Sequence, residues 1–187
     1  MAHGQPAAIR LPPRDPAMNR SILIGLYLAL SLPSPSQAAE VGAPAPSCTA
    51  QALDGGAPLP VGARPGQVVL VDFWASWCPP CLESFPFLEQ MQQELGDQGF
   101  KVIAISLDEE LGDARAFARK QTVSFSLGRD GKGDCPKSYG VKAMPSSYLI
   151  DRQGRLRQVH LGFKSGDKAP LRRQLEALLA EPGGSKP

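Results

Sequence analysis

VLVDFWASWCPPC, residues 69–81, is the stretch that indicates the fold most strongly. It overlaps Gln67–Trp74, a nearly continuous run of apolar and β-branched residues, which is typical of a strand covered on both faces. Pro79 and Pro80 suit the first turn of a helix, where the N–H groups have no partner within the helix. The stretch therefore predicts a buried strand that leads directly to Cys78 at the start of a helix.

The spacing of Cys78 and Cys81 suits a reversible disulfide. Residues three positions apart lie on one face of a helix, so the two sulfurs can bond. The positive end of the helix dipole favours a thiolate at the first cysteine. We therefore expect Cys78 to be the exposed attacking thiolate and Cys81 to be the shielded resolving thiol. A zinc site needs two more ligands at metal spacing, and Cys48, Cys135 and His160 stand alone, so no metal is expected.

The rest of the chain predicts one α/β domain. Helices are expected over residues 79–95, 108–120, 135–139 and 167–180, and further strands over 100–107, 123–127, 146–150 and 155–161. The early strand–helix–strand order implies parallel strands with helices on both faces of the sheet, and the last two strands form a hairpin. We interpret residues 39–66 as a lead-in segment with short edge strands, 67–181 as the domain, and 182–187 as a flexible tail.

Residues 1–38 have the organisation of a signal peptide. Three arginines precede the apolar run Ser21–Leu32, and small residues follow it up to Ala38. The run is shorter than the roughly 20 residues of a typical membrane-spanning helix. We expect cleavage after Ala38, with an uncleaved N-terminal anchor as the alternative. Met18 would be a more ordinary start than Met1, because residues 1–17 are long and Pro-rich for the leading part of such a signal.

Composition and charge exclude several classes of protein. The chain has 187 residues, of which 42% are hydrophobic, so it can bury a core and is not disordered throughout. Its 20 basic and 18 acidic residues give a net charge of +2, which is too small for a typical nucleic-acid-binding protein. Export would place the domain in an oxidising compartment, where thiols tend to pair.

Residues 69–81 resemble the active site of the thioredoxin superfamily, and Trp-Cys-Pro-Pro-Cys is most similar to that of the TlpA/ResA/DsbE-type periplasmic thiol–disulfide oxidoreductases. Two further segments match, GVKAMPSSYLIDRQG at 140–154 and VGAPAP at 41–46. The resemblance covers roughly residues 40–180. It implies the thioredoxin fold, with a central mixed sheet and helices on both faces, and a periplasmic dithiol reductant that needs no cofactor.

The resemblance also implies roles for individual residues. Cys78 and Cys81 match the redox pair, and Pro145 matches a cis-proline that lies opposite this pair. Met144 occupies the position that contacts the chain of a bound partner, and Trp77 resembles an aromatic ring that shields the site.

Asp72 resembles the buried acid of thioredoxin, beneath the second cysteine. Burial raises the pKa of a carboxyl group, so Asp72 can act as a base for Cys81 through a water. The alternative is an aspartate exposed to solvent at the end of a strand. One departure concerns Ser84, where relatives often carry Glu. A step of one residue turns a helix by about 100°, so Glu83 cannot replace that acid and is expected to be solvated.

Two cysteines remain outside the motif. In an oxidising compartment leftover thiols tend to pair, so we predict a structural disulfide between Cys48 and Cys135. The alternatives are two buried unpaired thiols or one exposed regulatory thiol.

The predicted reaction is the reduction of disulfides in exported proteins. The Cys78 thiolate attacks the partner, whose chain lies against Met144 and Pro145, and Cys81 then releases it. A membrane dithiol protein would restore the reduced form, and the domain is expected to be a monomer. A disulfide oxidant or isomerase would share every site residue. A copper-binding assembly factor would use the two cysteines with His160.

Overall fold

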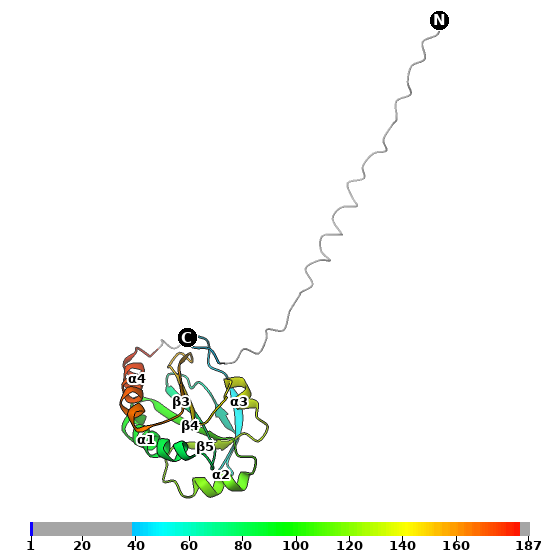
Figure 1. Cartoon of the computed structure of the whole chain (residues 1–187). Helices are drawn as coiled ribbons and strands as arrows, with labels where there is room; N and C mark the ends of the chain where they lie inside the picture. Colours follow the sequence, from blue (N-terminus) through cyan, green and yellow to red (C-terminus); the bar gives the residue numbers. More distant parts are fainter. Residues whose placement is uncertain (2–38, 184–187) are drawn as a thin grey trace. The chain divides into compact units, whose positions relative to one another are not determined.

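A computed structural model describes Met1 and residues 39–183 of the chain, and its sheet has seven strands in the order β2-β1-β5-β4-β3-β6-β7 (Figure 1). The strands are β1 Cys48–Ala52, β2 Leu59–Val61, β3 Val68–Trp74, β4 Phe100–Ser106, β5 Ser126–Arg129, β6 Ser146–Ile150 and β7 Leu156–Leu161. The helices are α1 Pro79–Leu95, α2 Leu111–Ala118, α3 Asp134–Tyr139 and α4 Lys168–Ala180. Short 3₁₀ turns cover η1 Gly96–Gln98 and η2 Ser165–Asp167.

The sheet is mixed, as predicted. Strand β3 is parallel to β4, and β4 is parallel to β5. Strand β6 is antiparallel to both β3 and β7, and β1 is antiparallel to β5 and β2. All seven residues of β3 are buried, which agrees with its continuous apolar sequence and its central place in the sheet.

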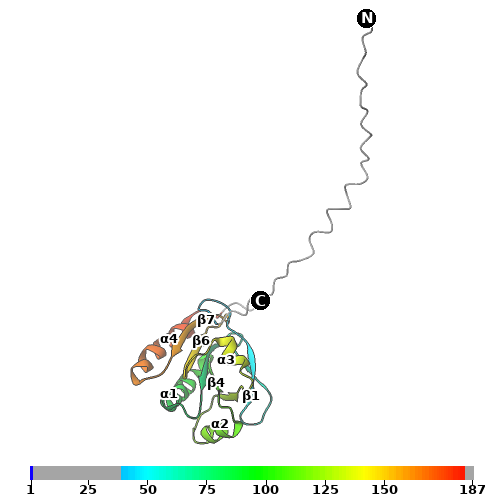
Figure 2. The ribbon, with the colours of Figure 1, turned by 45° about the vertical axis from the view of Figure 1, so that its right-hand side comes forward.

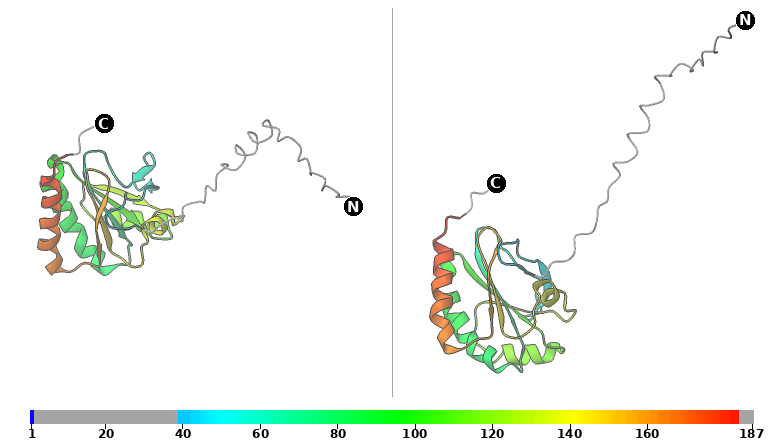
Figure 3. Two further views of the ribbon diagram at one scale, coloured as in Figure 1. Left: turned by 90° about the horizontal axis from the view of Figure 1, so that it is seen from above. Right: turned by 45° about the horizontal axis from the view of Figure 1, so that its top comes forward.

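Helices cover both faces of the sheet. Helices α1 and α4 lie together on one face, and α3 lies on the other (Figures 2 and 3). Alternate residues of β3 point to opposite faces, so Leu70 and Trp74 join the apolar cluster of α1, α2 and α4. Val71 and Phe73 join the cluster that contains Tyr139 of α3. The predicted α/β thioredoxin fold is therefore confirmed.

Helix α1 begins at Pro79, directly after the strand-to-helix loop. Its buried face includes the apolar side chains at helical spacing, Phe85, Leu88, Met91 and Leu95. The turn η1 follows and ends at Gly99, whose φ of +92° is a conformation that residues with a Cβ rarely adopt. The chain then reverses into β4.

Two predicted elements have the wrong bounds. The helix predicted over 108–120 is only Leu111–Ala118, because the Asp108 carboxylate is held in the preceding loop by hydrogen bonds from Ser76 and Ser106. The strand predicted over 123–127 is Ser126–Arg129. The N–H of Ser124 donates to the Glu89 carboxylate at 2.7 Å, which holds this part of the chain against α1 instead of in the sheet.

The ends of the chain are described only in part. Apart from Met1, the predicted signal peptide, residues 1–38, lies outside the described residues, as do the proposed start at Met18 and most of the predicted tail. The predicted lead-in segment contributes β1 and β2 at one edge of the sheet. Among the residues that the structure describes, no helix is both long and apolar enough to cross a membrane.

Candidate active site

The loop between β3 and α1 places Cys78 at the N-terminus of the helix. Cys78 is the residue before the first helical turn, and its N–H donates to the carbonyl of Ala75 at 3.1 Å. Pro79 and Pro80 occupy the first two helical positions, where their missing N–H groups leave no hydrogen bond unmade. The Cys78 and Cys81 sulfurs are 2.05 Å apart in a disulfide, with the two Cα atoms 5.3 Å apart.

Both sulfurs of this disulfide are shielded. Cys81 is fully buried, and Cys78 is only 3% exposed. The expectation of an exposed Cys78 is therefore wrong for the oxidised state, because its sulfur is bonded to Cys81 and belongs to the apolar cluster beneath α1. The neighbouring Trp77 is 68% exposed and presents its ring to solvent beside the disulfide.

The cis peptide bond Met144–Pro145 lies at the same end of the sheet. Ser146 pairs with Phe73, so Pro145 stands beside the point where β3 runs into the Cys78 loop. Met144 packs against the cluster that contains Cys78 and Cys81. The fold thus brings Met144 and Pro145, which are distant in the sequence, to the end of the sheet from which the Cys78 loop leaves.

Asp72 is fully buried on the α1 face of β3. It has the same orientation as Leu70 and Trp74, which pack in the cluster of Cys81. Burial raises the pKa of Asp72 to about 7, against the opposing effect of a hydrogen bond from Ser147. The alternative of a solvent-exposed strand-end aspartate is therefore wrong.

Only one oxygen of the Asp72 carboxylate is hydrogen-bonded within the described residues. The Ser147 hydroxyl donates to Asp72 Oδ1 at 2.6 Å, and Asp72 Oδ2 is buried without a partner there. Sequence reasoning did not single out Ser147. The available signal was the pair of serines in the otherwise apolar strand β6, whose five residues are all buried.

A second carboxylate holds the loop before Cys78. The hydroxyls of Ser76 and Ser106 donate to Asp108 at 2.8 and 2.7 Å, and Asp108 is only 3% exposed. Sequence reasoning missed this group too, and the available signal was an acid directly after the strand predicted over 100–107. The contact ties the end of β4 to the active-site loop.

The first turns of α1 show the consequence of the Ser84 departure. Ser84 is buried, and its hydroxyl donates to the Cys81 carbonyl at 3.1 Å. Glu83 is exposed, as predicted. No acid of α1 therefore takes the position that relatives often fill with Glu.

His160 lies on β7 and interacts with an acid. Its Nε2 atom is 3.3 Å from Asp167 Oδ2. Within the described part of the chain, no three or more His, Cys, Asp or Glu side chains are grouped so that they could hold a metal ion. A copper site built on Cys78, Cys81 and His160 has no support from this arrangement.

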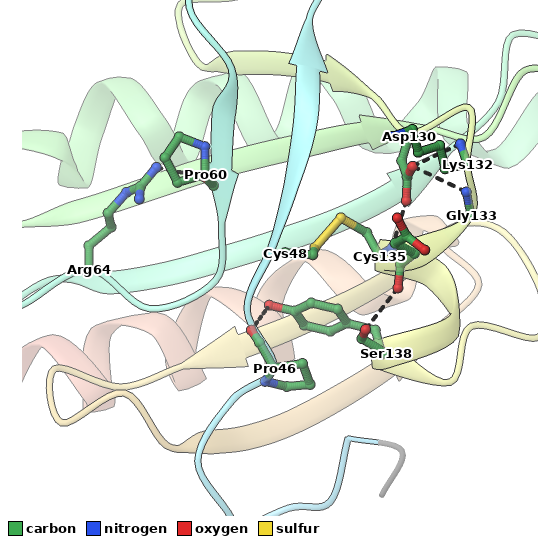
Figure 4. Close-up of a disulfide and its surroundings, with 11 residues drawn as sticks. Pro46, Cys48, Pro60, Arg64, Asp130, Lys132, Gly133, Cys135 and Ser138 are labelled. Atoms are coloured by element: carbon green, nitrogen blue, oxygen red, sulfur yellow. Dashed lines mark hydrogen bonds between the residues drawn. A yellow bond between two sulfur atoms is a disulfide. The ribbon is translucent and has the colours of Figure 1, made fainter. Parts of the chain in front are cut away.

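The second cysteine pair lies on the other face of the sheet. Cys48 of β1 and Cys135 of α3 form a disulfide with an S–S distance of 2.07 Å (Figure 4). Cys135 is fully buried in the cluster of Tyr139, whereas Cys48 is half-buried. Asp130 accepts hydrogen bonds from the N–H groups of Lys132 and Gly133, which precede α3, and from that of Cys135 in α3 at 2.6 Å.

Comparison with known proteins assigns the chain to a family. The Redoxin family model matches residues 40–177. The thiol–disulfide oxidoreductase ResA of Bacillus cereus is 28% identical over 135 residues, which are 72% of this chain and 78% of that protein. The thioredoxin-like protein YneN of Bacillus subtilis is 34% identical over 100 residues, 52% of this chain and 58% of that protein.

Solved structures give the same result. A structure named as the thiol:disulfide interchange protein DsbE of Chlorobium tepidum has a TM-score of 0.72 and 40% identity, and the match covers 76% of this chain and all of that one. A structure named as a protein disulfide isomerase of Bacteroides thetaiotaomicron has a TM-score of 0.68 and 29% identity, over 76% and 92% of the two chains. The chain belongs to the Redoxin family and is a thioredoxin-superfamily thiol–disulfide oxidoreductase of the TlpA/ResA/DsbE type.

Proposed function

We propose that this oxidoreductase is an exported dithiol reductant of disulfides in partner proteins, with Cys78 and Cys81 as its redox pair. The observation that supports this best is the position of Cys78 at the start of α1, in a disulfide with Cys81 and at the sheet end that carries the cis Met144–Pro145 bond. A thiolate at a helix N-terminus is stabilised by the helix dipole, so Cys78 is the sulfur that attacks.

The reaction has two exchange steps. In the reduced protein the Cys78 thiolate attacks a disulfide of the partner, and one partner sulfur leaves as a thiolate. Cys81 then loses its proton and attacks Cys78 Sγ, which breaks the mixed disulfide and releases the second partner sulfur. Two electrons pass from the Cys78–Cys81 pair to the partner, and the disulfide present in this structure is the product state.

Asp72 is the proposed base of the second step. Its unpartnered Oδ2 lies in the layer of side chains beneath α1, where Cys81 is buried. Burial raises the pKa of Asp72 to about 7, so the group can take and release a proton near neutral pH. A water between the carboxylate and Cys81 would carry the proton.

The partner chain is proposed to bind against Met144 and Pro145, with Trp77 at its side. Met144 is only partly buried and packs against the apolar cluster that includes Cys78 and Cys81, and Trp77 is one of the few exposed large apolar residues of the described chain. Exposed aromatic groups of this kind contribute strongly to protein contacts. Proteins that are exported with disulfides are the expected substrates.

Export and renewal complete the proposal. Residues 1–38 would direct the protein to the periplasm and be removed there, or would anchor it to the membrane. A membrane dithiol protein would reduce the Cys78–Cys81 disulfide after each cycle. Assembly of cytochrome c, assembly of a metal centre such as a copper centre, and general reductive repair are the open candidates for its use, and the domain would act as a monomer.

Trapping of the mixed disulfide tests the proposal. In the exporting organism Cys81→Ser should accumulate covalent complexes on Cys78, because the second step is blocked. The matched control Cys78→Ser should capture nothing. The captured proteins identify the substrates. If Cys81→Ser captured no protein, the reductant role would be contradicted.

The redox potential decides the direction. Reference proteins span about −270 mV for a reductant and about −120 mV for an oxidant. An equilibrium with glutathione should place the Cys78–Cys81 pair in the reducing half of this range. A potential above about −150 mV would instead support an oxidant or isomerase. This is the second candidate function, because the Bacteroides structure is named as a protein disulfide isomerase.

A further inference from the structure

Ser147 lies in a row of three residues that crosses the sheet. It pairs with Asp72 on β3 and with His160 on β7, so the three side chains share the α1 face. Ser147 is 5% exposed, and its hydroxyl is 2.6 Å from Asp72 Oδ1. The adjacent Ser146 points to the other face, and its hydroxyl donates to the carbonyl of Ala143.

The Ser147 hydroxyl is the one hydrogen-bond donor to Asp72 among the described residues. On the other side of β3, the residue paired with Asp72 is Ala104 of β4, which has no polar side chain. Ser84, three residues after Cys81, donates to the Cys81 carbonyl instead. A buried carboxylate with a single donor has its orientation set by that donor, because no second bond competes.

Ser147 also leaves the two carboxylate oxygens unequal. Oδ1 accepts the hydroxyl proton, whereas Oδ2 has no partner in the described chain. A proton that arrives at the carboxylate therefore has one free oxygen to bind. We propose that Ser147 is a positioning residue of the exchange reaction, which holds Asp72 by Oδ1 and presents Oδ2 to the proton of Cys81.

This inference rests on the proposed role of Asp72 as a base and adds the residue that controls it. The hydrogen bond stabilises the carboxylate and so opposes the effect of burial on the pKa of Asp72. No charged side chain contributes to that shift. Of the neighbouring elements, α1 and the residue before it contribute the thiols of the reduced pair, and β4 contributes Ala104. His160 on β7 interacts with Asp167.

The titration of Asp72 gives the first test. In the oxidised protein, ¹³C NMR of the Asp72 carboxyl group should show a midpoint near 7, in line with its raised pKa of about 7. Ser147→Ala should raise this midpoint by about one pH unit, since a charge-assisted hydrogen bond is lost. Ser147→Thr keeps the hydroxyl on a β-branched residue that suits a strand and should restore the midpoint.

The two exchange steps give the second test. A protein whose Cys78–Cys81 pair alone is reduced releases one thionitrobenzoate from Ellman's reagent when Cys78 attacks, and a second when Cys81 resolves. Ser147→Ala should leave the first phase unchanged. It should slow the second phase about fivefold at pH 7, because a midpoint about one unit higher leaves far less carboxylate, and the rate should recover at higher pH.

Matched variants separate the possible failures. Ser146→Ala removes a buried hydroxyl on the opposite face of β6 and should change neither the midpoint nor the second phase. If Ser147→Ala behaves like Ser146→Ala while Asp72→Asn slows the second phase, the positioning role of Ser147 is wrong. The proposed role of Asp72 as the base would still be supported. If Asp72→Asn also leaves the second phase and its pH profile unchanged, the proposed base fails, and the role of Ser147 fails with it. Trapping on Cys78 remains a separate measure of the reductant function.

Discussion

The backbone N–H of Ser76 lies 3.1 Å from both carboxylate oxygens of Asp108. The Ser76 hydroxyl adds a third contact to the same carboxylate. Ser76 is two residues before Cys78, and Asp108 is two residues after Ser106, the last residue of β4. The loop that leads to Cys78 is therefore held by an acid from the segment that follows β4.

Asp108→Ala should loosen this loop. The change leaves the N–H and hydroxyl of Ser76 without their acceptor, which should lower the free energy of unfolding by about 1–3 kcal/mol. Urea denaturation of the oxidised protein measures this loss, and the first phase with Ellman's reagent should slow as Cys78 loses its fixed position. The control is Asp113→Ala, because Asp113 is an exposed acid of α2. This change should alter the free energy of unfolding by no more than about 0.5 kcal/mol. Equal stability of the two variants would contradict the anchoring role.

The Cys48–Cys135 disulfide should stabilise the fold without taking part in exchange. It joins residues with a sequence separation of 87, and loop-closure entropy for a loop of this length gives about 4–5 kcal/mol. Cys48→Ala/Cys135→Ala should lower the free energy of unfolding by this order and retain the exchange phases of Cys78 and Cys81. The reason is that the pair lies on the opposite face of the sheet from Cys81. Loss of both exchange phases in a folded double variant would give this disulfide a redox role.

Local sequence patterns predicted the elements whose formation depends mainly on neighbouring residues. Three such patterns span only a few residues each. They are the apolar run of β3, the two prolines at the start of α1, and the helical spacing of Phe85 and Leu88. The structure agrees with these predictions to within a residue or two. The cysteine pair belongs to the same class, because a separation of three residues fixes its geometry within one helical turn.

The sequence does not reveal contacts between distant segments as clearly. The bounds of α2 and β5 depend on Asp108 and Glu89, which accept hydrogen bonds from residues 32 and 35 positions away. The partner of Asp72 is 75 positions away and follows from the register of β3 with β6. The burial of Cys78 reflects its membership of an apolar cluster built from distant segments, which the sequence motif alone does not specify.

Trp77→Ala should affect the partner and not the fold. The side chain is 68% exposed, so its removal should change the free energy of unfolding by no more than about 0.5 kcal/mol. The rate with a protein disulfide such as insulin should fall severalfold, while the rate with Ellman's reagent should change little. Val41→Ala is the control, because Val41 is 59% exposed and its neighbour Gly42 bonds to Leu156, at the end of β7 away from Pro145. A similar loss with both disulfides would indicate damage to the cysteine pair itself.

Asp72 should make the oxidised protein less stable as the pH rises. Burial raises the pKa of Asp72 from 3.8 to about 7, so the folded state binds this proton more tightly than the unfolded state. Asp72 therefore does not lower the free energy of unfolding below pH 3.8. Above that pH the free energy of unfolding falls, and the fall continues until the pH passes about 7. A shift of this size corresponds to about 4 kcal/mol.

Asp72→Asn removes the charge and should remove this pH dependence. The free energy of unfolding of the variant minus that of the wild type should increase by about 4 kcal/mol between pH 4 and pH 8, with Asn favoured at the higher pH. Urea denaturation of both oxidised proteins across this range measures the difference, in which the other titrating groups cancel. A constant difference for Asp72→Asn would mean that the carboxyl titrates normally in the folded protein, and Asp72 would then be mostly ionised at neutral pH and a weaker base for Cys81.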